Sequence, residues 1–346
     1  MKTRKSLVVL GSICLISILS SLLFIAACVQ PASAQPKTYE WRLQHMFPAG
    51  TGNDKFTKTF ADRVLKMSGG RIKITVFGVN QLAPAAEMLT ATAKGVIDLG
   101  YSFPPYHTGK IPATSFGGTI PYGFDNMGEV LIYYHPMGAE KILREEYAKQ
   151  GVHLISISFA TSDVPIFSKK PVRKAADFKG LKLRGVGLIG DVLKEAGAAP
   201  AFFSGPEIYP ALERGVIDAA VWGDTQGCVD LGLHEITKYM IYPITTNYHD
   251  WYMRLDLWNA LPDDLKEILT VATHAWSTYW AEYSDYAGWT ARQKLVKERK
   301  FEVINLPPAE VAKMEGYAFA LYDRLAAKDP ATAKMVQLLK DLKALR

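Results

Sequence analysis

The 346-residue sequence predicts a two-lobed α/β fold with a long bridging helix, and two observations carry that prediction. The first is an internal repeat: residues 87–98 and 207–218 share Glu at the start, Ala at the fifth place, a basic residue before Gly, and a final Gly-Val-Ile-Asp. The second is a proline-free helical pattern from Pro262 to Lys300, of which even thirty residues would span about 45 Å. Since that exceeds the length of one lobe, the helix should bridge two lobes.

Each copy of the repeat predicts a short helix, a glycine that ends it and a buried strand. Glu87 and Glu207 lie at the positive end of the helix dipole, and the repeat glycine enters the left-handed conformation without steric cost. Apolar strands follow at Leu99–Phe103 and Ala219–Trp222. Because these parts make half of a parallel α/β unit, the duplication favours two similar lobes with a site between them. Chance similarity of two such corners is the alternative.

The remaining elements follow from local periodicity and from helix start and stop signals. We expect strands at Tyr39–Gln44 and Arg71–Phe77. Between them lies a helix that begins at a cap formed by Asn53 or Asp54 and ends at Met67. This strand–helix–strand order is the start of a doubly wound lobe. The later elements are a helix over about 127–149, strands at Val152–Phe159, Pro165–Lys170 and Phe178–Arg184, a helix at Ile189–Ala196, a strand at Ala201–Phe203, and helices at about 308–327 and 330–343. We expect lobe I to comprise 38–157 plus about 248–280, and lobe II about 158–247 plus 281–346.

Residues 1–34 predict a secretory signal peptide, with a basic start, an uncharged run from Leu7 to Ile25 and the small-residue cleavage site Ala32-Ser-Ala34. The alternative is a lipoprotein signal, because Ile25-Ala-Ala-Cys28 would place a lipid on Cys28. An uncleaved membrane anchor is a third reading. No later stretch reaches the ~18 uncharged apolar residues of a spanning helix, so we expect an exported protein.

Composition excludes several classes of function. Removing three basic residues with the leader lowers 40 Lys and Arg to 37 against 34 Asp and Glu, a balance that does not favour nucleic-acid binding. Cys228 is the one cysteine after the leader, so we expect a buried small residue and neither a disulfide nor a zinc site. The sequence has no G-x-S-x-G and no H-E-x-x-H motif, which favours a binding protein without a cofactor over an enzyme.

In an open α/β sheet, ligands bind beyond the carboxyl ends of the strands. Applied to the two repeat copies, this rule selects Phe103 and Tyr106 in the first lobe, and Trp222 and Asp224 in the second. Applied to the strand before the second copy, it selects Arg184, whose charge-assisted bonds to a carboxylate would contribute ~1.5–3 kcal/mol each. We expect Arg184→Ala to abolish anion binding and to leave the unfolding temperature nearly unchanged. The alternatives are a solvated arginine and aromatic residues of the core.

A glycine-rich segment offers a rival interpretation. Gly185-Val-Gly-Leu-Ile-Gly190 fits G-x-G-x-x-G, and Glu207 follows at about the distance of a ribose-binding acid. These features are typical of a dinucleotide-binding oxidoreductase. Export away from nucleotide pools and the charged Lys182 and Arg184 on the preceding strand speak against it, so the exported oxidoreductase is the alternative.

Two segments resemble a known family. Phe178-Lys-Gly-Leu-Lys-Leu-Arg184, followed by Glu207–Ala219, is similar to the solute-binding proteins of tripartite ATP-independent periplasmic (TRAP) transporters. The export signal, Gly69–Ile74 and the bridging helix resemble the family as well. The resemblance implies the periplasmic binding protein fold and a periplasmic protein that delivers a small organic acid to a TRAP membrane permease. A ligand-sensing lipoprotein of the same fold is the alternative, and a homodimer is left open.

The resemblance also implies which residues bind the ligand. The arginine matching Arg184 clamps the substrate carboxylate, the residue matching Trp222 lines the cleft, and the region matching Pro105–Tyr106 contacts the ligand. Further contacts are implied at the end of the crossing strand, at Phe159, Ser162 and Asp163.

The sequence departs from one subgroup of the family. Relatives that bind keto acids with a cation usually have Glu-Trp where this chain has Val221-Trp222, and a glutamine near residues 162–164 that is missing here. Whether a metal ion bridges the ligand is therefore open. Asp224, Asp163 and Asn247 are the side chains that could compensate for the missing ligands.

Overall fold

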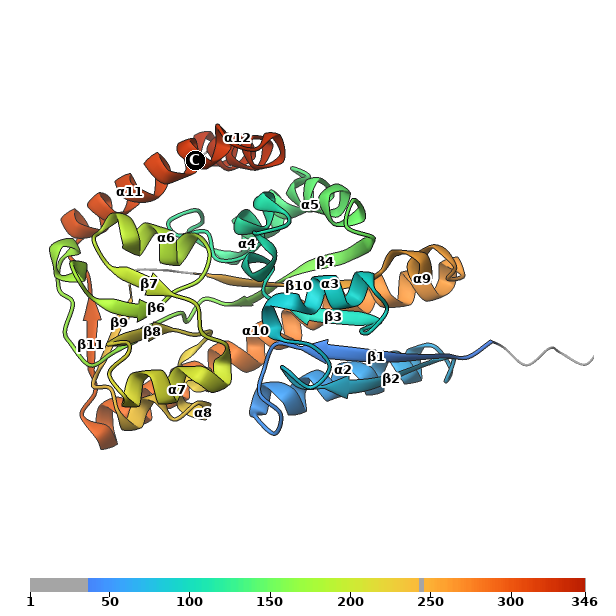
Figure 1. Ribbon diagram of the computed structural model, residues 1–346, viewed down its shortest axis with the longest axis horizontal. Coiled ribbons are helices and arrows are strands. Elements are labelled where there is room, and N and C mark those ends of the chain that lie inside the picture. Colours follow the sequence, from blue (N-terminus) through green and yellow to red (C-terminus); the bar gives the residue numbers. More distant parts are fainter. Residues whose placement is uncertain (1–36, 243–245, 346) are drawn as a thin grey trace, which may run out of the picture. The chain divides into compact units, whose positions relative to one another are not determined.

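The computed structural model of the chain describes residues 37–242 and 246–345. From Glu40 onward the chain forms one compact unit with two β-sheets, and helix α10 (Asp263–Arg299) runs past both (Figure 1). The two-lobed α/β prediction is therefore confirmed. The expected leader and Cys28 lie outside the described residues. In the part of the chain that the structure describes, no helix is long and apolar enough to cross a membrane.

The first lobe is built on a five-stranded sheet with the order β2-β1-β3-β10-β4. Its strands are β1 (Tyr39–His45), β2 (Ile72–Phe77), β3 (Leu99–Ser102), β4 (Val152–Thr161) and β10 (Asn247–Arg254). Its helices are α2 (Gly52–Met67), α3 (Met88–Ala93), α4 (Met127–Tyr134), α5 (Ala139–Ala148) and α9 (Leu255–Asn259), with 3₁₀ turns η1 (Ala85–Glu87), η2 (Pro104–His107) and η3 (Pro112–Gly117). Strands β1 and β3 are parallel, and β10 is antiparallel to both β3 and β4.

The second lobe is built on a six-stranded sheet with the order β11-β9-β5-β8-β6-β7. Its strands are β5 (Ile166–Ser168), β6 (Lys182–Arg184), β7 (Ala199–Ala201), β8 (Ala219–Val221), β9 (Tyr239–Tyr242) and β11 (Glu302–Asn305). Its helices are η4 (Ala175–Phe178), α6 (Leu188–Glu195), α7 (Gly205–Glu213), α8 (Thr225–Asp230) and η5 (Leu233–Glu235). Because β6 is parallel to β7 and β8, the order β7-β6-β8 repeats the order β2-β1-β3 of the first lobe.

The two repeat copies make the same local contacts. Asp98 accepts a hydrogen bond from the backbone N–H of Arg42 at 2.9 Å, and the Arg42 guanidinium donates to the carbonyl oxygen of the repeat glycine at 2.7 Å. In the second lobe, the backbone N–H of Lys182 lies 3.4 Å from Asp218, and Lys182 Nζ donates to the second repeat glycine at 3.1 Å. Both glycines have the expected left-handed backbone, with φ of +76° and +72°. The repeat therefore fixes each helix end against the neighbouring strand.

Helix α10 confirms the predicted bridge. It starts after Pro262, contains 37 residues and spans about 55 Å. It contacts β4 and α2 of the first lobe and α8 of the second. The last two helices also reach both lobes, since α11 (Pro308–Ala326) contacts α6 and α12 (Pro330–Ala344) contacts α4 and α5.

Several local predictions are wrong. The expected helix over 127–149 is two helices, α4 and α5, because Pro136 cannot continue the hydrogen-bond ladder and Gly138 has φ of +90°. Thr51, rather than Asn53 or Asp54, caps α2 by accepting a hydrogen bond from the backbone N–H of Asp54. Strand β6 is limited to three residues, β7 begins two residues before the expected start, and β9, β10 and β11 were not predicted.

The segment that crosses from β4 to β5 is anchored on α10. The backbone N–H of Ser162 donates to Asp285 Oδ1 at 3.0 Å, and the Ser162 hydroxyl donates to Oδ2 at 3.0 Å. Asp163 is buried and accepts hydrogen bonds from the Tyr242 hydroxyl at 2.9 Å and the Thr225 N–H at 3.2 Å. A Cβ on Gly288 of α10 would lie 2.3 Å from the Asp163 carboxylate. The missing side chain of Gly288 therefore makes room for this anchor.

We predict that Gly288→Ala destabilises the protein. Overpacking costs ~1–3 kcal/mol, which exceeds the ~1 kcal/mol that alanine gains over glycine in a helix. The matched control is Gly316→Ala in α11, where an added Cβ has no neighbour within 4 Å, so only the helix gain remains. Thermal melts followed by circular dichroism should show a lower midpoint for Gly288→Ala and an equal or higher one for Gly316→Ala. Equal midpoints for both variants would show that Asp163 can move aside.

Candidate ligand-binding cleft

A cleft lies between the carboxyl ends of strands from the two sheets, as the strand-end rule predicts. Its lining includes Phe47, Phe103, Tyr106 and His249 of the first lobe, Arg184, Trp222 and Asp224 of the second lobe, and Trp280 of α10. Among the described residues that line the cleft, Arg184 is the one with a cationic side chain. The cleft therefore combines a single positive charge with aromatic walls.

Arg184 is buried at the end of β6, with 4% of its surface exposed. Its neighbours in the ladder are Ala201 on β7 and Ala220 on β8, whose small side chains leave space for the guanidinium. Nε donates to the Phe203 carbonyl at 3.1 Å and Nη1 to the Val221 carbonyl at 2.7 Å. The interpretation of a solvated arginine is therefore wrong. Removing this side chain would leave buried carbonyl oxygens without donors, so Arg184→Ala should lower the unfolding temperature, and the expectation of an unchanged one is wrong.

The guanidinium also reaches across the cleft. Its Nη2 donates to the Tyr106 hydroxyl of the first lobe at 3.0 Å, and its Cζ lies 4.9 Å from the centre of the Trp222 ring. Since arginine has five N–H donors, these bonds fix its plane and leave donors for a ligand. Burial raises the pKa of Tyr106, which the charge of Arg184 partly opposes, so Tyr106 keeps its hydrogen at neutral pH. Arg184 and Tyr106 can therefore both donate to an anion.

The first lobe has a neutral side chain at the matching position. Gln44 on β1 lies opposite Gly100 on β3, as Arg184 on β6 lies opposite Ala220 on β8. Gln44 is fully buried, accepts hydrogen bonds from the Leu82 and Ala83 N–H groups at 2.7 and 3.0 Å, and donates to the Ala83 carbonyl at 2.8 Å. The Gln44 amide thus makes its hydrogen bonds within the first lobe. The positive charge of the cleft comes from Arg184 of the second lobe.

Aromatic rings form much of the wall around the charge. Phe103 and Tyr106 meet edge to face with ring centroids 5.5 Å apart, and Tyr106 contacts Phe202 of the second lobe at 5.4 Å. Phe47 stacks on Trp280 of α10 at 5.2 Å. These surfaces suit the apolar part of a ligand, because aromatic rings bury area without needing many polar partners.

Asp224 caps α8 at the edge of the cleft. Its carboxylate accepts hydrogen bonds from the Gly227 N–H at 2.6 Å and from the Ser284 hydroxyl on α10. Burial raises the pKa of Asp224 to about 7, and the bonds from Ser284 and Gly227 oppose the rise. The adjacent Cys228 is fully buried and donates to the Trp222 carbonyl at 3.1 Å, which confirms the expectation of a buried small residue.

His249 also lines the cleft, although the strand-end rule did not select it. It is buried on β10, and burial lowers its pKa to about 3, so the ring is neutral. Its Nε2 accepts from the Asn247 amide at 3.3 Å, and we therefore assign the hydrogen to Nδ1, which lies 2.8 Å from the Tyr101 hydroxyl. No local signal could have found His249, because β10 enters the first sheet from a distant part of the chain.

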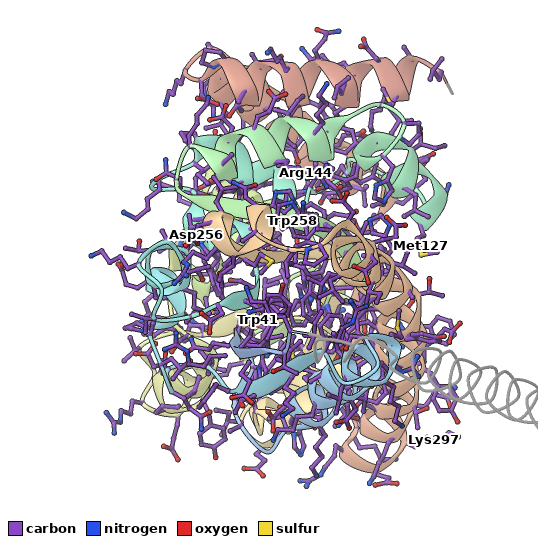
Figure 2. All side chains as sticks on the ribbon, turned by 90° about the vertical axis from the view of Figure 1, so that its right-hand side faces the viewer. Trp41, Met127, Arg144, Asp256, Trp258 and Lys297 are labelled. Carbon is purple, nitrogen blue, oxygen red and sulfur yellow. The ribbon has the colours of Figure 1, made fainter. Side chains whose placement is uncertain are left out.

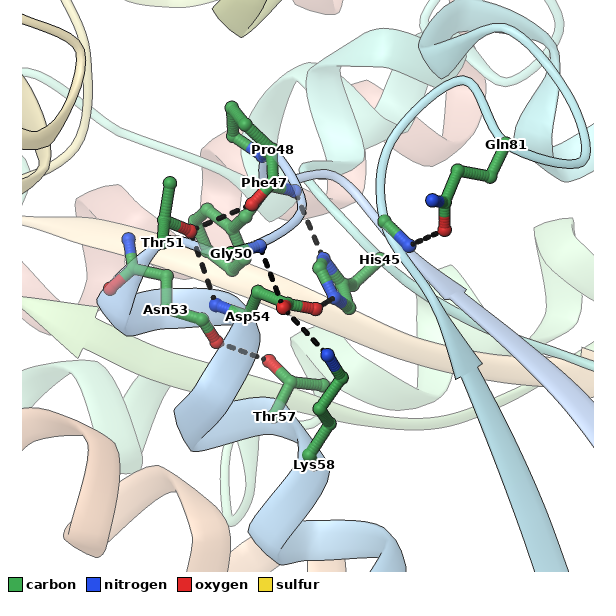
Figure 3. A network of polar contacts seen from close by, with 11 residues as sticks. His45, Phe47, Pro48, Gly50, Thr51, Asn53, Asp54, Thr57, Lys58 and Gln81 are labelled. Carbon is green, nitrogen blue, oxygen red and sulfur yellow. Dashed lines mark hydrogen bonds and ion pairs between the residues drawn. The ribbon is translucent and has the colours of Figure 1, made fainter.

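The loop after β1 is held by a buried hydrogen-bond network around His45 and Asp54 (Figure 3). His45 Nε2 lies 2.9 Å from Asp54 Oδ1, and the Phe47 N–H donates to His45 Nδ1 at 3.2 Å. Asp54 Oδ2 also accepts from the Gly50 N–H at 2.9 Å and from Lys58 Nζ at 2.8 Å. Burial lowers the pKa of His45, against the hydrogen bond with Asp54 that raises it. This network holds the loop that carries Phe47 into the cleft.

The structure does not bring every expected residue to the cleft. Arg184, Trp222, Tyr106, Phe103 and Asp224 line it together. Phe159 and Ser162 line a separate hollow beside α10, and Ser162 is exposed and bonded to Asp285. Asp163 is held by Tyr242 and Thr225 outside the cleft lining. The end of the crossing strand therefore reaches the cleft through Ala160, Thr161 and Val164, whereas the expected Ser162 and Asp163 lie outside the lining.

The glycine-rich segment allows close packing, of backbone on backbone at Gly185 and Gly190 and of backbone on the Pro105 ring at Gly187. A Cβ on Gly190 would lie 2.8 Å from the Gly185 carbonyl carbon, and a Cβ on Gly187 would lie 2.6 Å from Pro105 of the first lobe. Glu207 accepts from the Ser204 N–H and hydroxyl at 2.7 and 2.6 Å, as a capping box of α7. The acid expected to bind a ribose is thus used inside the fold, and the dinucleotide interpretation is not supported.

Comparison with known proteins agrees with this geometry. Residues 43–329 match the model of the bacterial extracellular solute-binding protein family 7. A monocarboxylate 2-oxoacid-binding periplasmic protein of Nostoc sp. is 28% identical over 310 residues, which cover 87% of this chain and 83% of that protein.

Solved structures show the same fold. A TRAP periplasmic solute-binding protein of Colwellia psychrerythraea, with bound calcium and pyruvate, superposes with a TM-score of 0.83 at 27% identity and covers 89% of this chain and 95% of its own. One from Pseudoalteromonas atlantica, with bound sodium and pyruvate, gives a TM-score of 0.79 at 25% identity and covers 89% and 95%. The chain therefore belongs to family 7 of the bacterial extracellular solute-binding proteins, the solute-binding proteins of TRAP transporters.

Proposed function

We propose that the cleft binds a small organic acid with one carboxylate, which Arg184 and Tyr106 hold by charge-assisted hydrogen bonds. The observation that carries this proposal is that Arg184 supplies the one cationic side chain among the described lining residues. One cation balances one carboxylate, whereas a second carboxylate in this desolvated site would lack a partner. The rest of the ligand would pack against Phe103, Trp222 and the neighbouring rings.

Proteins of this family are periplasmic receptors that bind small organic anions and work with membrane permease subunits. For this chain we propose closure of lobe I (38–157 plus about 248–280) on lobe II (about 158–247 plus 281–346) by a hinge motion. The bond from Arg184 to Tyr106 and the approach of Gly187 to Pro105 join residues of the two proposed lobes, which supports a closed arrangement. A lipid on Cys28 would tether the closed receptor near its permease.

The cleft does not fit a cation that bridges protein and ligand. Val221 has no ligating side chain, and its carbonyl oxygen accepts from Arg184 at 2.7 Å. The oxygens of Asp224 accept from Gly227 and Ser284, and Asn247 Oδ1 accepts from the Thr119 hydroxyl at 3.0 Å. Asp163 lies outside the lining. Calcium and sodium belong to the similar proteins that contain them, and we propose that the ligand of this chain binds Arg184 directly.

A thermal-shift screen of the mature protein tests this function. We predict that short-chain monocarboxylates, including 2-oxo acids, raise the melting temperature, because a ligand that binds only the folded state stabilises it. Dicarboxylates of similar size should shift it less, NAD and NADP should not shift it, and EDTA should leave the shift unchanged. A higher melting temperature with nucleotides alone would overturn the proposal. If EDTA abolished the shift caused by monocarboxylates, a metal ion would be needed for ligand binding.

The role of Arg184 is best tested with a variant that keeps its charge. Arg184→Lys should weaken monocarboxylate binding about 10- to 100-fold in calorimetry, because lysine loses the planar fork and bonds worth ~1.5–3 kcal/mol. Arg42→Lys is the matched control, since Lys182 already fills the equivalent structural role in the second lobe. It should leave the affinity unchanged. Equal affinities for wild type and Arg184→Lys would remove Arg184 from the site.

Asp224 should make binding depend on pH. Its pKa of about 7 lies far above the usual value for a carboxyl group, so it is neutral at lower pH and becomes an anion as the pH rises. A second negative charge in the cleft opposes an anionic ligand, while Arg184 stays charged and His249 stays neutral. The dissociation constant should therefore increase from about pH 6 to about pH 8. Asp224→Asn should give a flatter profile, and an identical slope in the variant would assign the dependence to another group.

A further inference from the structure

Three side chains that commonly bind metals converge outside the cleft, where α4, α5 and α10 of the first lobe meet. His135 follows the last residue of α4, Glu140 is in the first turn of α5, and His274 lies on α10. One ligand atom from each lies within 4.8 Å of the other two, and these residues form the one such group found among residues 37–242 and 246–345. The site thus gathers two imidazoles and a carboxylate from three helical segments.

Ordinary hydrogen bonding does not explain this grouping. His135 Nδ1 lies 3.8 Å from Glu140 Oε2, which is too long for a hydrogen bond. The rings of His135 and His274 have centroids 5.1 Å apart and an interplanar angle of 58°. The two imidazoles therefore approach the same carboxylate, and His135 does so without a hydrogen bond to it.

The carboxylate is held in place by groups behind it. Glu140 Oε1 accepts from Arg144 Nη2 at 2.6 Å, and Oε2 accepts from the Ile157 N–H of β4 at 2.9 Å. Arg144 in turn donates to the Leu154 and Ile155 carbonyls at 2.8 and 3.0 Å, and Figure 2 shows it on the side of α5 that faces the sheet. Supporting hydrogen bonds of this kind orient metal-binding carboxylates. Oε2 keeps a second lone pair, and this oxygen lies 3.8 Å from His135 Nδ1.

We propose that His135, Glu140 and His274 form a binding site for Zn²⁺ or a similar divalent transition metal ion. Two imidazole nitrogens and one carboxylate oxygen suit Zn²⁺, whereas Ca²⁺ and Mg²⁺ prefer sites made of oxygen alone. Tetrahedral bonds of about 2.0–2.2 Å need ligand atoms roughly 3.3–3.5 Å apart, so the observed spacing requires a closing movement of about 1 Å. His135 is half-buried and His274 is exposed, so both rings can make that movement, and water would take the fourth position.

A metal ion at this site would fasten the bridging helix to the first lobe. Glu140 and His135 belong to the α4–α5 corner, which packs on β4, and His274 lies on α10, which contacts α8 of the second lobe with its other half. The bound ion would therefore add a link between α10 and the first lobe without entering the ligand cleft. We expect it to raise thermal stability and to leave the affinity for organic acids unchanged.

The test is calorimetric titration of Zn²⁺ into the mature chain, prepared without a histidine tag. We expect one site per chain with a dissociation constant on the order of micromolar, and a higher melting temperature in the presence of Zn²⁺. His135→Ala and His274→Ala should each weaken binding by more than about tenfold, since loss of even a supporting group costs that much. Millimolar Mg²⁺ should not compete.

His234→Ala is the matched control, because His234 lies in η5 of the second lobe, away from the site. It should bind Zn²⁺ as the wild type does. Melting temperatures without metal verify that each variant folds, and the exposed His274 can be removed without disturbing the core. The proposal is overturned if the wild type does not bind Zn²⁺, or if binding persists unchanged in both His135→Ala and His274→Ala.

Discussion

The cleft depends on the way the fold accommodates one buried positive charge, the guanidinium of Arg184. A charged group removed from water is costly unless hydrogen bonds and charge replace its hydration. Here the replacements come from the Phe203 carbonyl just after β7, from the Val221 carbonyl at the end of β8, and from the Tyr106 hydroxyl of the other lobe. The Arg184 side chain therefore connects the ends of β7 and β8 in the second lobe. It also connects them to Tyr106 of the first lobe.

The duplicated scaffold explains why this charge can be where it is. In each lobe a basic side chain donates a hydrogen bond to the carbonyl oxygen of the repeat glycine. Arg42 binds Gly95 in the first lobe, and Lys182 binds Gly215 in the second. Two residues further along each strand, the side chain reaches the strand end, where Gln44 closes on its own lobe and Arg184 extends across the cleft. The two lobes are therefore alike in backbone but differ at this matching position, which holds the neutral Gln44 in one lobe and the charged Arg184 in the other. This difference places the positive charge of the cleft on the second lobe alone.

Local signals in the sequence were sufficient for part of the scaffold. The repeat glycines, the start of α10 after Pro262 and the strand-end rule located both lobes, the bridge and Arg184, because each depends on a short stretch of chain. Contacts between distant segments were not readable in the same way. His249 reaches the cleft only because β10 inserts between β3 and β4. Asp163 turns towards α10 because Gly288 leaves space there.

The charge balance of the cleft connects ligand binding with closure. The three hydrogen-bond partners that the structure gives to Arg184 are neutral oxygens, so they satisfy its N–H groups without neutralising its charge. Asp224, with a pKa of about 7, is at most a partial counter-charge near neutral pH, and its oxygens are bonded to Gly227 and Ser284. A ligand carboxylate would supply the missing negative charge at the point where the lobes meet. Because an ion pair gains most when water is excluded, the carboxylate would favour the closed form, and closure would in turn strengthen the hold on the carboxylate.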